Sequence, residues 1–259
     1  MRRLIRRHGI ARDFVAVALA FLAISISCAA QTAPATPTAD QIIEKYIAAL
    51  GGREAIQKQT TRTSLGTIDV PAMHISGTVM IHEKSPNKIL QVVIINGNAF
   101  RQACDGKVAW SDDPAEGLRV LSGAELKEAQ RDADFYHALH LHELYAKLVV
   151  TGTEQVDDRD AYVVEGTMAG ESEPDKIYFD VKSGLALRVM GRRHTPDGDS
   201  EVQEDFQDYR PVDGVELPFT ILQRGGSSDF TIRMSEIHHG ADLPDTEFTQ
   251  PEEPQTKVQ

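Results

Sequence analysis

Apolar residues in this chain follow a helical spacing in one early stretch and a strand spacing over most of the remainder. The helical stretch is residues 38–50, where Thr38 and Gln41 form the pattern of a capping box and Gly51 and Gly52 end the run. Its apolar positions, three or four residues apart, are Ile42, Ile43, Tyr46, Ile47 and Leu50. We expect an amphipathic helix here, with a further short helical turn in "REAIQKQ".

From Thr60 onward the apolar period changes to two. In "MHISGTVMI" one face of the expected strand carries Met73, Ile75, Val79 and Ile81, and the other carries His74, Ser76, Thr78 and His82. The next stretch, "KILQVVII", is apolar at nearly every position, so the strand expected there needs cover on both faces. Asn96 and Gly97 follow it and predict a hairpin turn.

The rest of the chain consists of short strand patterns separated by turn signals, with a single helical interruption. Ser122 and Glu125 predict a second capping box, and residues 122–146 have helical spacing. Strand patterns then resume, from "LVVTGTEQV" to "DFTIRMSEI". The pattern predicts a mainly β fold of the α+β class, in which about 11 or 12 strands form one large curved antiparallel sheet with two or three helices. We expect one domain over residues 38–251.

The first 30 residues have the pattern of an export signal. Five arginines lie in the first 13 residues, and fourteen apolar or small residues follow them, which is too short for a comfortable membrane span of about 20 residues. Cleavage after Ala30 competes with lipidation of Cys28, although Ser25 stands where a leucine is usual before a lipidated cysteine. We expect a signal peptide at 1–30, a Pro/Ala/Thr linker at 31–37, a disordered tail at 252–259 and a periplasmic location.

Charge and cysteine content narrow the functional classes. The formal charge is −12, and it becomes −16 if residues 1–30, with five arginines and one aspartate, are removed. A chain this acidic is not drawn electrostatically to nucleic acid or to an anionic membrane surface. Cys104 would have no disulfide partner, and no base lies near it in the sequence, so we expect a half-buried, unreactive thiol. Catalytic and nucleotide-binding motifs are absent, and we expect no enzyme activity and no cofactor.

The stretch "YHALHLHELY" brings His137, His140 and His142 close together in the sequence, followed by Glu143. On a helix His137 and His140 share a face, but His142 is rotated from His140 by about 200°. On a strand only His140 and His142 share a face. Neither backbone aims three ligands at one ion, so we expect no metal site; the open alternative is a two-histidine site completed by Glu143 or by His238 and His239 of the last strand. We interpret the apolar residues of this stretch as the contacts of a helix that crosses the sheet.

Six stretches of the sequence match, in order, the motifs of a known family. They are "TADQIIEKYIAALGG", "DGKVAWSDDPAEGLRVLSGAEL", "VDDRDAYVVEGT", "KIYFDVKSGLALR", "DYRPVDGVELPFTI" and "PDTEFTQP". Through them the chain resembles the periplasmic lipoprotein-carrier (LolA/LolB-like) superfamily, in the branch labelled outer membrane lipoprotein-sorting protein. The resemblance implies a half-open antiparallel barrel of about 11 strands, closed by two or three helices, whose concave apolar face holds acyl chains. No arginine can be matched to those that latch the lid in that family.

The sequence therefore predicts a non-enzymatic periplasmic carrier or binder of lipid or lipidated protein. Acyl chains would lie in an apolar concavity under helices around residues 40–58 and 122–146. The residues that we expect to line this concavity are Ile89, Val93, Ile95, Val108, Trp110, Phe135, Leu139, Leu141 and Leu144. Because Val108 and Trp110 are two positions apart in a strand pattern, either both side chains line it or neither does.

The expected partners are lipid acyl chains or a lipidated client protein, with no nucleic acid. We expect a monomer, with peripheral or lipid-anchored contact with a membrane as an open option. One alternative is a cell-envelope interaction or assembly module whose barrel is filled by its own side chains. A weaker alternative is a metal-dependent hydrolase that uses the region of His137, His140 and His142. The crowded histidines also suggest that closure of the helical lid is sensitive to mildly acidic pH.

Overall fold

The computed structural model describes residues 36–195, 198–226 and 228–252. The expected signal peptide, nearly all of the expected linker and most of the expected tail lie outside these ranges. The chain from Thr36 onward forms one compact unit. Within the described ranges, no helix is both long enough and apolar enough to cross a membrane.

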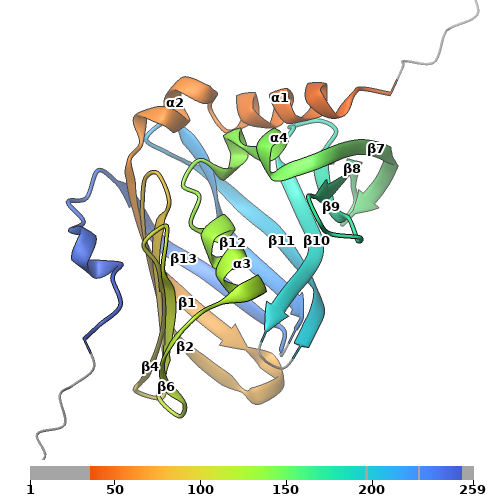
Figure 1. Ribbon diagram of the computed structural model, residues 1–259. Helices are drawn as coiled ribbons and strands as arrows, with labels where there is room; N and C mark the ends of the chain where they lie inside the picture. Colours follow the sequence, from red (N-terminus) through yellow and green to blue (C-terminus); the bar gives the residue numbers. More distant parts are fainter. Residues whose placement is uncertain (1–35, 196–197, 227, 253–259) are drawn as a thin grey trace, which may run out of the picture. The chain divides into compact units, whose positions relative to one another are not determined.

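One curved antiparallel sheet makes up most of the described chain (Figure 1). Its 13 strands within those ranges are β1 (Thr61–Val70), β2 (Ile75–Lys84), β3 (Lys88–Ile95), β4 (Asn98–Cys104), β5 (Ala109–Asp113), β6 (Gly117–Val120), β7 (Tyr145–Val156), β8 (Arg159–Met168), β9 (Asp175–Asp180), β10 (Ala186–Thr195), β11 (Gly198–Val212), β12 (Val215–Gly225) and β13 (Phe230–His239). Successive strands are neighbours, and β1 pairs with β13 in the middle. The sheet stays open because β6 and β7 are its two edges. The predicted mainly β half-barrel is confirmed, with slightly more strands than expected.

The helical segment between β6 and β7 crosses the inner side of the curved sheet (Figure 1). It consists of α3 (Gly123–Asp132), the single 3₁₀ turn η2 (His137–Leu139) and the short helix α4 (Leu141–Leu144). Because β6 and β7 are consecutive in the chain but lie at opposite edges of the sheet, the segment that joins them must span the opening. The predicted helical interruption is confirmed, but it ends earlier than expected, because Tyr145 already begins β7.

The two predicted capping boxes have different outcomes. At the start of α1 (Ala39–Ala49), the Thr38 backbone N–H donates to Gln41 Oε1 at 2.9 Å and the Gln41 N–H donates to Thr38 Oγ1 at 3.2 Å, as predicted. At the start of α3, Ser122 makes no side-chain capping bond. Its expected partner Glu125 is held instead by the guanidinium of Arg119 at 2.8 and 2.9 Å, which lowers the pKa of the glutamate. The second capping box was therefore wrong.

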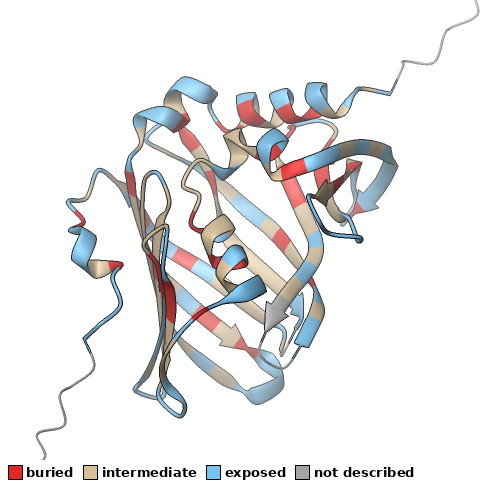
Figure 2. Cartoon of the chain, viewed as in Figure 1, coloured by how far each residue is buried: buried red, intermediate tan, exposed pale blue. Residues whose placement is uncertain are grey.

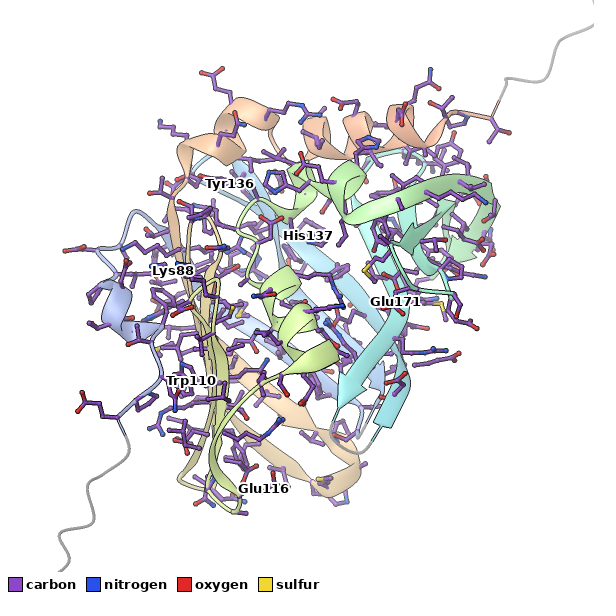
Figure 3. All side chains as sticks on the ribbon, viewed as in Figure 1. Lys88, Trp110, Glu116, Tyr136, His137 and Glu171 are labelled. Atoms are coloured by element: carbon purple, nitrogen blue, oxygen red, sulfur yellow. The ribbon has the colours of Figure 1, made fainter. Side chains whose placement is uncertain are left out.

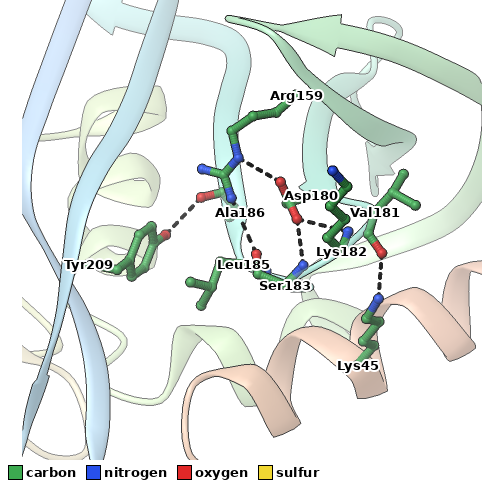
Figure 4. Close-up of polar contacts among 9 residues, drawn as sticks. All are labelled: Lys45, Arg159, Asp180, Val181, Lys182, Ser183, Leu185, Ala186 and Tyr209. Carbon is green, nitrogen blue, oxygen red and sulfur yellow. Dashed lines mark hydrogen bonds and ion pairs between the residues drawn. The ribbon is translucent and has the colours of Figure 1, made fainter.

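Helix α1 lies across one end of the sheet and is fixed there near its middle and at its C-terminal end (Figures 1 and 4). Near its middle, Lys45 Nζ donates to the carbonyl of Val181 at 2.6 Å. At its end, the Glu216 backbone N–H donates to the Leu50 carbonyl at 2.9 Å. Gly51 follows with φ +114, and a Cβ there would lie 2.1 Å from the Gly214 carbonyl oxygen, so only glycine permits this approach. Helix α2 (Arg53–Lys58) continues the same cover.

The turn beneath α1, between β9 and β10, is organised by a buried aspartate (Figure 4). Asp180 accepts from the backbone N–H groups of Lys182 at 2.8 Å and Ser183 at 2.5 Å, and from Arg159 Nε at 2.6 Å. Burial alone would raise the pKa of Asp180, but these hydrogen bonds lower it below its usual range. The charged carboxylate thus fixes the turn to which α1 is attached.

The register of β3 shows how the two faces of the sheet are covered. Ile89, Val93 and Ile95 point to the inner face, whereas Leu90 and Val92 point to the outer face. On the inner face Ile89 packs against α3, and Val93 packs with the core that includes α1. On the outer face Leu90 and Val92 pack against the C-terminal segment 241–250, which contains the 3₁₀ turn η3 (Asp245–Glu247). Cover on both faces, predicted from "KILQVVII", is confirmed.

Of two turns near the start of the sheet, one agrees with the sequence pattern and the other delays the start of the expected strand. Asn96 and Gly97, with φ of 51 and 81, form the predicted hairpin between β3 and β4. The expected strand around "MHISGTVMI" begins later than its apolar pattern, because Met73 belongs to the 3₁₀ turn η1 (Pro71–Met73) and His74 has φ 53. Ile81 and Val79 nevertheless share the inner face, as the period of two predicts.

Candidate ligand-binding face and its helical lid

The inner face of the sheet is apolar, and its cover is complete only near α1. There Ile43, Val164 and Phe179 are fully buried. Further along the strands, apolar side chains on the same face remain half-buried, as the tan strand segments in Figure 2 indicate. They are Ile81, Val93, Ile95, Val189, Phe206, Ile221 and Ile232. This face therefore retains apolar surface that a ligand could cover.

The apolar contact between helix α3 and the inner face is confined to one edge of the sheet, and small side chains make most of it. Ala129 and Ala133, with Leu126 beside them, pack against Cys104 and Ala109. Cys104 is completely buried, more deeply than the sequence predicted, and burial raises the pKa of its thiol. Because alanines bury little apolar area, this contact alone is a weak attachment for the helix.

Arg193 on β10 provides the second attachment of α3. Its guanidinium lies 3.0 Å from Glu128 and 3.1 Å from Asp132, both on α3, and 3.0 Å from Glu204 on β11. Burial would lower the pKa of Arg193, but the three carboxylates raise it further above its usual range, so the side chain stays charged. We name these four residues the Arg193 cluster.

The sequence did not identify Arg193. Glu128 and Asp132 lie four positions apart on the expected helix, a spacing that places two carboxylates side by side and favours a cation nearby. Their partner, Arg193, is 61 residues from Asp132 in the sequence. No local pattern could select this arginine among the others of the chain. Only the strand order of the sheet brings β10 opposite α3.

A second polar group on the inner face was also missed. The Tyr145 hydroxyl donates to Asp175 Oδ2 at 2.9 Å. Burial raises the pKa of both side chains, while the positive charges of Arg131 and Arg193 lower the pKa of Asp175. Gly191 makes room for this carboxylate, because a Cβ there would lie 2.5 Å from Asp175 Oδ1. The aspartate is thus a second polar position on this face, besides the Arg193 cluster.

A pocket of about 400 Å³ opens beside α3, η2 and α4. Its lining residues recur every three or four positions along the helical segment, so they form one side of it. They are Lys127, Gln130, Arg131, Asp134, His137, His140, Glu143 and Leu144. His137, labelled in Figure 3, lines this pocket and is exposed to solvent. Partial desolvation by the surrounding protein nevertheless lowers the pKa of His137, against the opposing charges of Asp134 and Asp132.

The three histidines do not converge, as their angular spacing predicted. His137 and His140 line the pocket, and His140 Nδ1 lies 2.8 Å from Asp134. His142 is exposed and lies 3.8 Å from Asp40 of α1. Among the residues that the structure describes, no group of three or more His, Cys, Asp or Glu side chains could hold a metal ion.

The predicted lining residues fall into three groups. Val93, Leu139, Leu141 and Leu144 belong to the core under α1, and Ile95 shares the face of Val93. Ile89 lies under α3. Phe135 lies beside the start of β1, where the guanidinium of Arg62 is 5.6 Å from the centre of its ring.

Trp110 and Val108 do not face the concavity. Trp110 pairs with Ala103 on the outer face, is 2% exposed, and donates from Nε1 to the Phe248 carbonyl at 3.1 Å. In Figure 3 it lies on the side of the strands that faces the C-terminal segment. Val108 precedes β5 and is 40% exposed. The structure therefore places neither residue on the inner face, and Trp110 instead packs in the outer core.

The C-terminal segment also borders a groove of about 580 Å³ on the outer face. Its floor includes Met80, Val92 and Trp110. The segment is held to the sheet by ion pairs from Lys84 and Lys88 to Asp245, at 2.8 and 2.7 Å, and by further contacts of Glu247 and Phe248. This groove is separated from the inner face by the sheet itself.

An open, curved antiparallel sheet crossed on its inner side by helices is the LolA-like half-barrel fold, and comparison with solved structures agrees with this description. A DUF1329 family protein from Desulfovibrio piger superposes with a TM-score of 0.55 at 15% identity, over 83% of this chain and 98% of that one. A LolA superfamily protein from Nitrosomonas europaea gives 0.51 at 17% identity, over 83% and 99%. A putative outer membrane lipoprotein-sorting protein domain from Vibrio parahaemolyticus gives 0.51 at 13%, over 80% and 94%.

These similarities confirm the predicted resemblance at the level of the fold. No family model matches the chain, and no curated protein sequence matches it. At identities this low, a shared fold does not transfer a ligand or a partner.

Proposed function

We propose that the protein is a non-enzymatic periplasmic carrier or binder of lipid or of a lipidated protein. Acyl chains would lie on the inner face of the sheet, between the strands and α3. The observation that supports this proposal most directly is the row of half-buried apolar side chains on that face, such as Val189, Phe206 and Ile232, beneath a helix that is itself polar.

The attachment of α3 fits a part that moves. Helix α1 is fixed by a buried apolar stripe and by hydrogen bonds to Val181, in the turn after β9, and to Glu216, at the start of β12, so it acts as a permanent end of the half-barrel. Helix α3 has only a shallow apolar contact, at Ala129 and Ala133. Its other attachments are polar: the Arg193 cluster, the Arg119–Glu125 pair and the hydrogen bond from Gln130 to the Lys107 carbonyl. Lifting α3 would expose inner-face apolar surface, and each methylene of a chain that entered would gain about 0.8 kcal/mol.

Native mass spectrometry of protein purified without detergent tests the proposal directly. We expect bound species with the masses of lipids, and we expect the delipidated protein to take up a fluorescent fatty acid. A variant that places a charge on the inner face, Val189→Asp, should lose this uptake. Its matched control is Met190→Asp, on the opposite face of the same strand. Absence of co-purified lipid together with absence of fatty-acid uptake would reject the proposal.

The alternative is a cell-envelope interaction or assembly module, and the outer groove beside the C-terminal segment favours it. This groove offers apolar side chains, Met80 and Val92, next to Arg101 on a face that α3 does not cover. The two functions predict different sites of ligand protection. Hydrogen exchange that slows at α3 in the presence of lipid supports the carrier, whereas protection limited to β2–β5 and residues 241–250 by a protein partner supports the interaction module.

A further inference from the structure

The pocket beside α3 and α4 is lined by two cations, Lys127 and Arg131. Within the described part of the chain, the side chains of Lys127 and Arg131 make no ion pair and no hydrogen bond, although Arg131 is half-buried. A half-buried arginine normally has an acceptor. The two cations lie four positions apart on α3, so they project to the same side and can share one anion.

The rest of the pocket lining has the opposite charge. Asp134 and Glu143 contribute carboxylates, and Asp134 accepts from His140 Nδ1 and from the Tyr136 backbone N–H. Because its Nδ1 carries the proton that Asp134 accepts, a neutral His140 leaves Nε2 as a further acceptor. The lining therefore carries two cations and two carboxylates, and neither a simple anion nor a simple cation complements all of it.

From this polarity we infer that the pocket binds a zwitterionic aminophosphate group, with the phosphate at Lys127 and Arg131 and the primary ammonium at Asp134, Glu143 and His140. The guanidinium fork matches two phosphate oxygens, and Lys127 adds a point charge. A primary ammonium has three N–H donors and can satisfy several acceptors at once. Arg193 does not take part, because its guanidinium is already surrounded by three carboxylates.

The position of the pocket relates it to the inner face. Leu144 lines the pocket and also packs against the apolar core under α1. An amphiphile could therefore place its headgroup among the charges and its chains along the half-buried strands. The inference rests on the proposed function, and it names the headgroup that the carrier would select.

Three probes with the same acyl chain separate the headgroup from the chain. They are a lysophosphatidylethanolamine, a lysophosphatidic acid and an uncharged monoacylglycerol, each titrated below its critical micelle concentration into delipidated protein. We expect the aminophosphate probe to bind about tenfold more tightly than the other two. Glycerophosphoethanolamine, which has no chain, should compete with it, and this arm tells whether the free headgroup is itself a ligand.

Matched variants identify the residues responsible. Lys127→Gln combined with Arg131→Gln should remove the preference and weaken aminophosphate binding about tenfold, while monoacylglycerol binding stays unchanged. Glu143→Gln should reduce only the advantage of the aminophosphate over the phosphatidic acid. The charge-matched control, Lys107→Gln with Lys147→Gln at exposed positions outside the pocket, should keep wild-type selectivity.

Two negative results have distinct meanings. Equal affinity of the wild type for all three probes, or unchanged selectivity in the Lys127/Arg131 variant, overturns the headgroup site while the carrier function stands. Failure of every probe, the monoacylglycerol included, overturns both.

Discussion

The guanidinium of Arg193 lies 3.1 Å from the carboxylate of Asp132, and this ion pair joins strand β10 to helix α3 across the inner face of the sheet. Glu128 and Glu204 complete the cluster, so three carboxylates from two elements share one guanidinium. Arg193 is thereby the cation that joins Asp132 of α3 to Glu204 of β11. The attachment of the helix is therefore electrostatic on this side and apolar on the other.

Replacing Arg193 by glutamine should loosen α3 while leaving the sheet folded. The variant removes the cation that the three carboxylates share, which we expect to cost the attachment about 2 kcal/mol. Amide hydrogen exchange in residues 123–132 should then be about thirtyfold faster, and exchange in β11–β13 should be unchanged. The matched control is Arg192→Gln, an exposed neighbour on the same strand. Equal exchange in the two variants would contradict this role of Arg193.

Phe248 should hold the C-terminal segment on the outer face. Its ring is completely buried, and its carbonyl accepts from the indole of Trp110, the single tryptophan of the chain. Phe248→Ala removes a large buried side chain, a change that costs about 3–5 kcal/mol and is expected to detach the segment locally. Acrylamide quenching of Trp110 fluorescence should increase strongly. Thr249→Ala, at an exposed position, should leave quenching unchanged, and a Phe248→Ala protein that is quenched like the wild type would disprove the role.

The architecture could be predicted from the sequence because it depends on local periodicity. The change of period at Thr60, the Asn96 and Gly97 turn and the doubly apolar "KILQVVII" each report a local property, and all three were correct. The alternation of side chains between the two faces of β3 was predicted as well, because Ile89, Val93 and Ile95 do share the inner face. What the pattern could not state was which layer covers which face, since the outer cover comes from residues some 150 positions further along the chain.

The same reasoning explains the errors at the candidate site. Trp110 was assigned with the inner residues because alternation within a strand does not say how that strand pairs with β4, and the pairing with Ala103 places it outside. Glu125 has the correct spacing for a capping box, but its carboxylate accepts from the guanidinium of Arg119, six residues earlier, and not from the backbone at Ser122. The Arg193 cluster joins residues up to 65 positions apart, and only tertiary structure determines it.

Asp205 should be a major source of stability on the outer face. It is 2% exposed and accepts hydrogen bonds from Arg188, Arg224 and Gln203. Burial alone would raise the pKa of Asp205, but these hydrogen bonds lower it below 3.8. Asp205→Asn should therefore cost about 3 kcal/mol at neutral pH and lower Tm by about 6–12 °C.

The loss of stability caused by Asp205→Asn should become smaller in acid. Because the folded-state pKa of Asp205 is lowered, its contribution is present above pH 3.8 and declines as the pH falls through the folded-state pKa. The difference in Tm between wild type and Asp205→Asn should shrink in this acidic range. Asp208→Asn is the control, since Asp208 forms an exposed pair with Arg210 and should change Tm little. A constant difference between pH 7 and pH 3 would show that the charge of Asp205 is not the cause.

His137 should make the helical segment less stable in mildly acidic solution. Partial desolvation by the surrounding protein lowers the pKa of His137; Asp134 and Asp132 act against this shift, and His140 and Arg193 add to it. In the folded protein the imidazole therefore stays neutral at a pH where an unfolded histidine already binds a proton. The folded state binds fewer protons in this range, so stability is full above pH 6.5 and declines as the pH falls toward the lowered folded-state pKa. Because the ring still reaches solvent, screening should keep the effect below about 1 kcal/mol.

Hydrogen exchange in residues 123–144 at pH 5.5 and 7.5, corrected for intrinsic rates, measures this loss of stability. His137→Gln should remove the acid-dependent increase, whereas His238→Gln, at an exposed position on β13, should retain it. If both variants and the wild type show the same increase, the sensitivity to acid arises elsewhere in the protein.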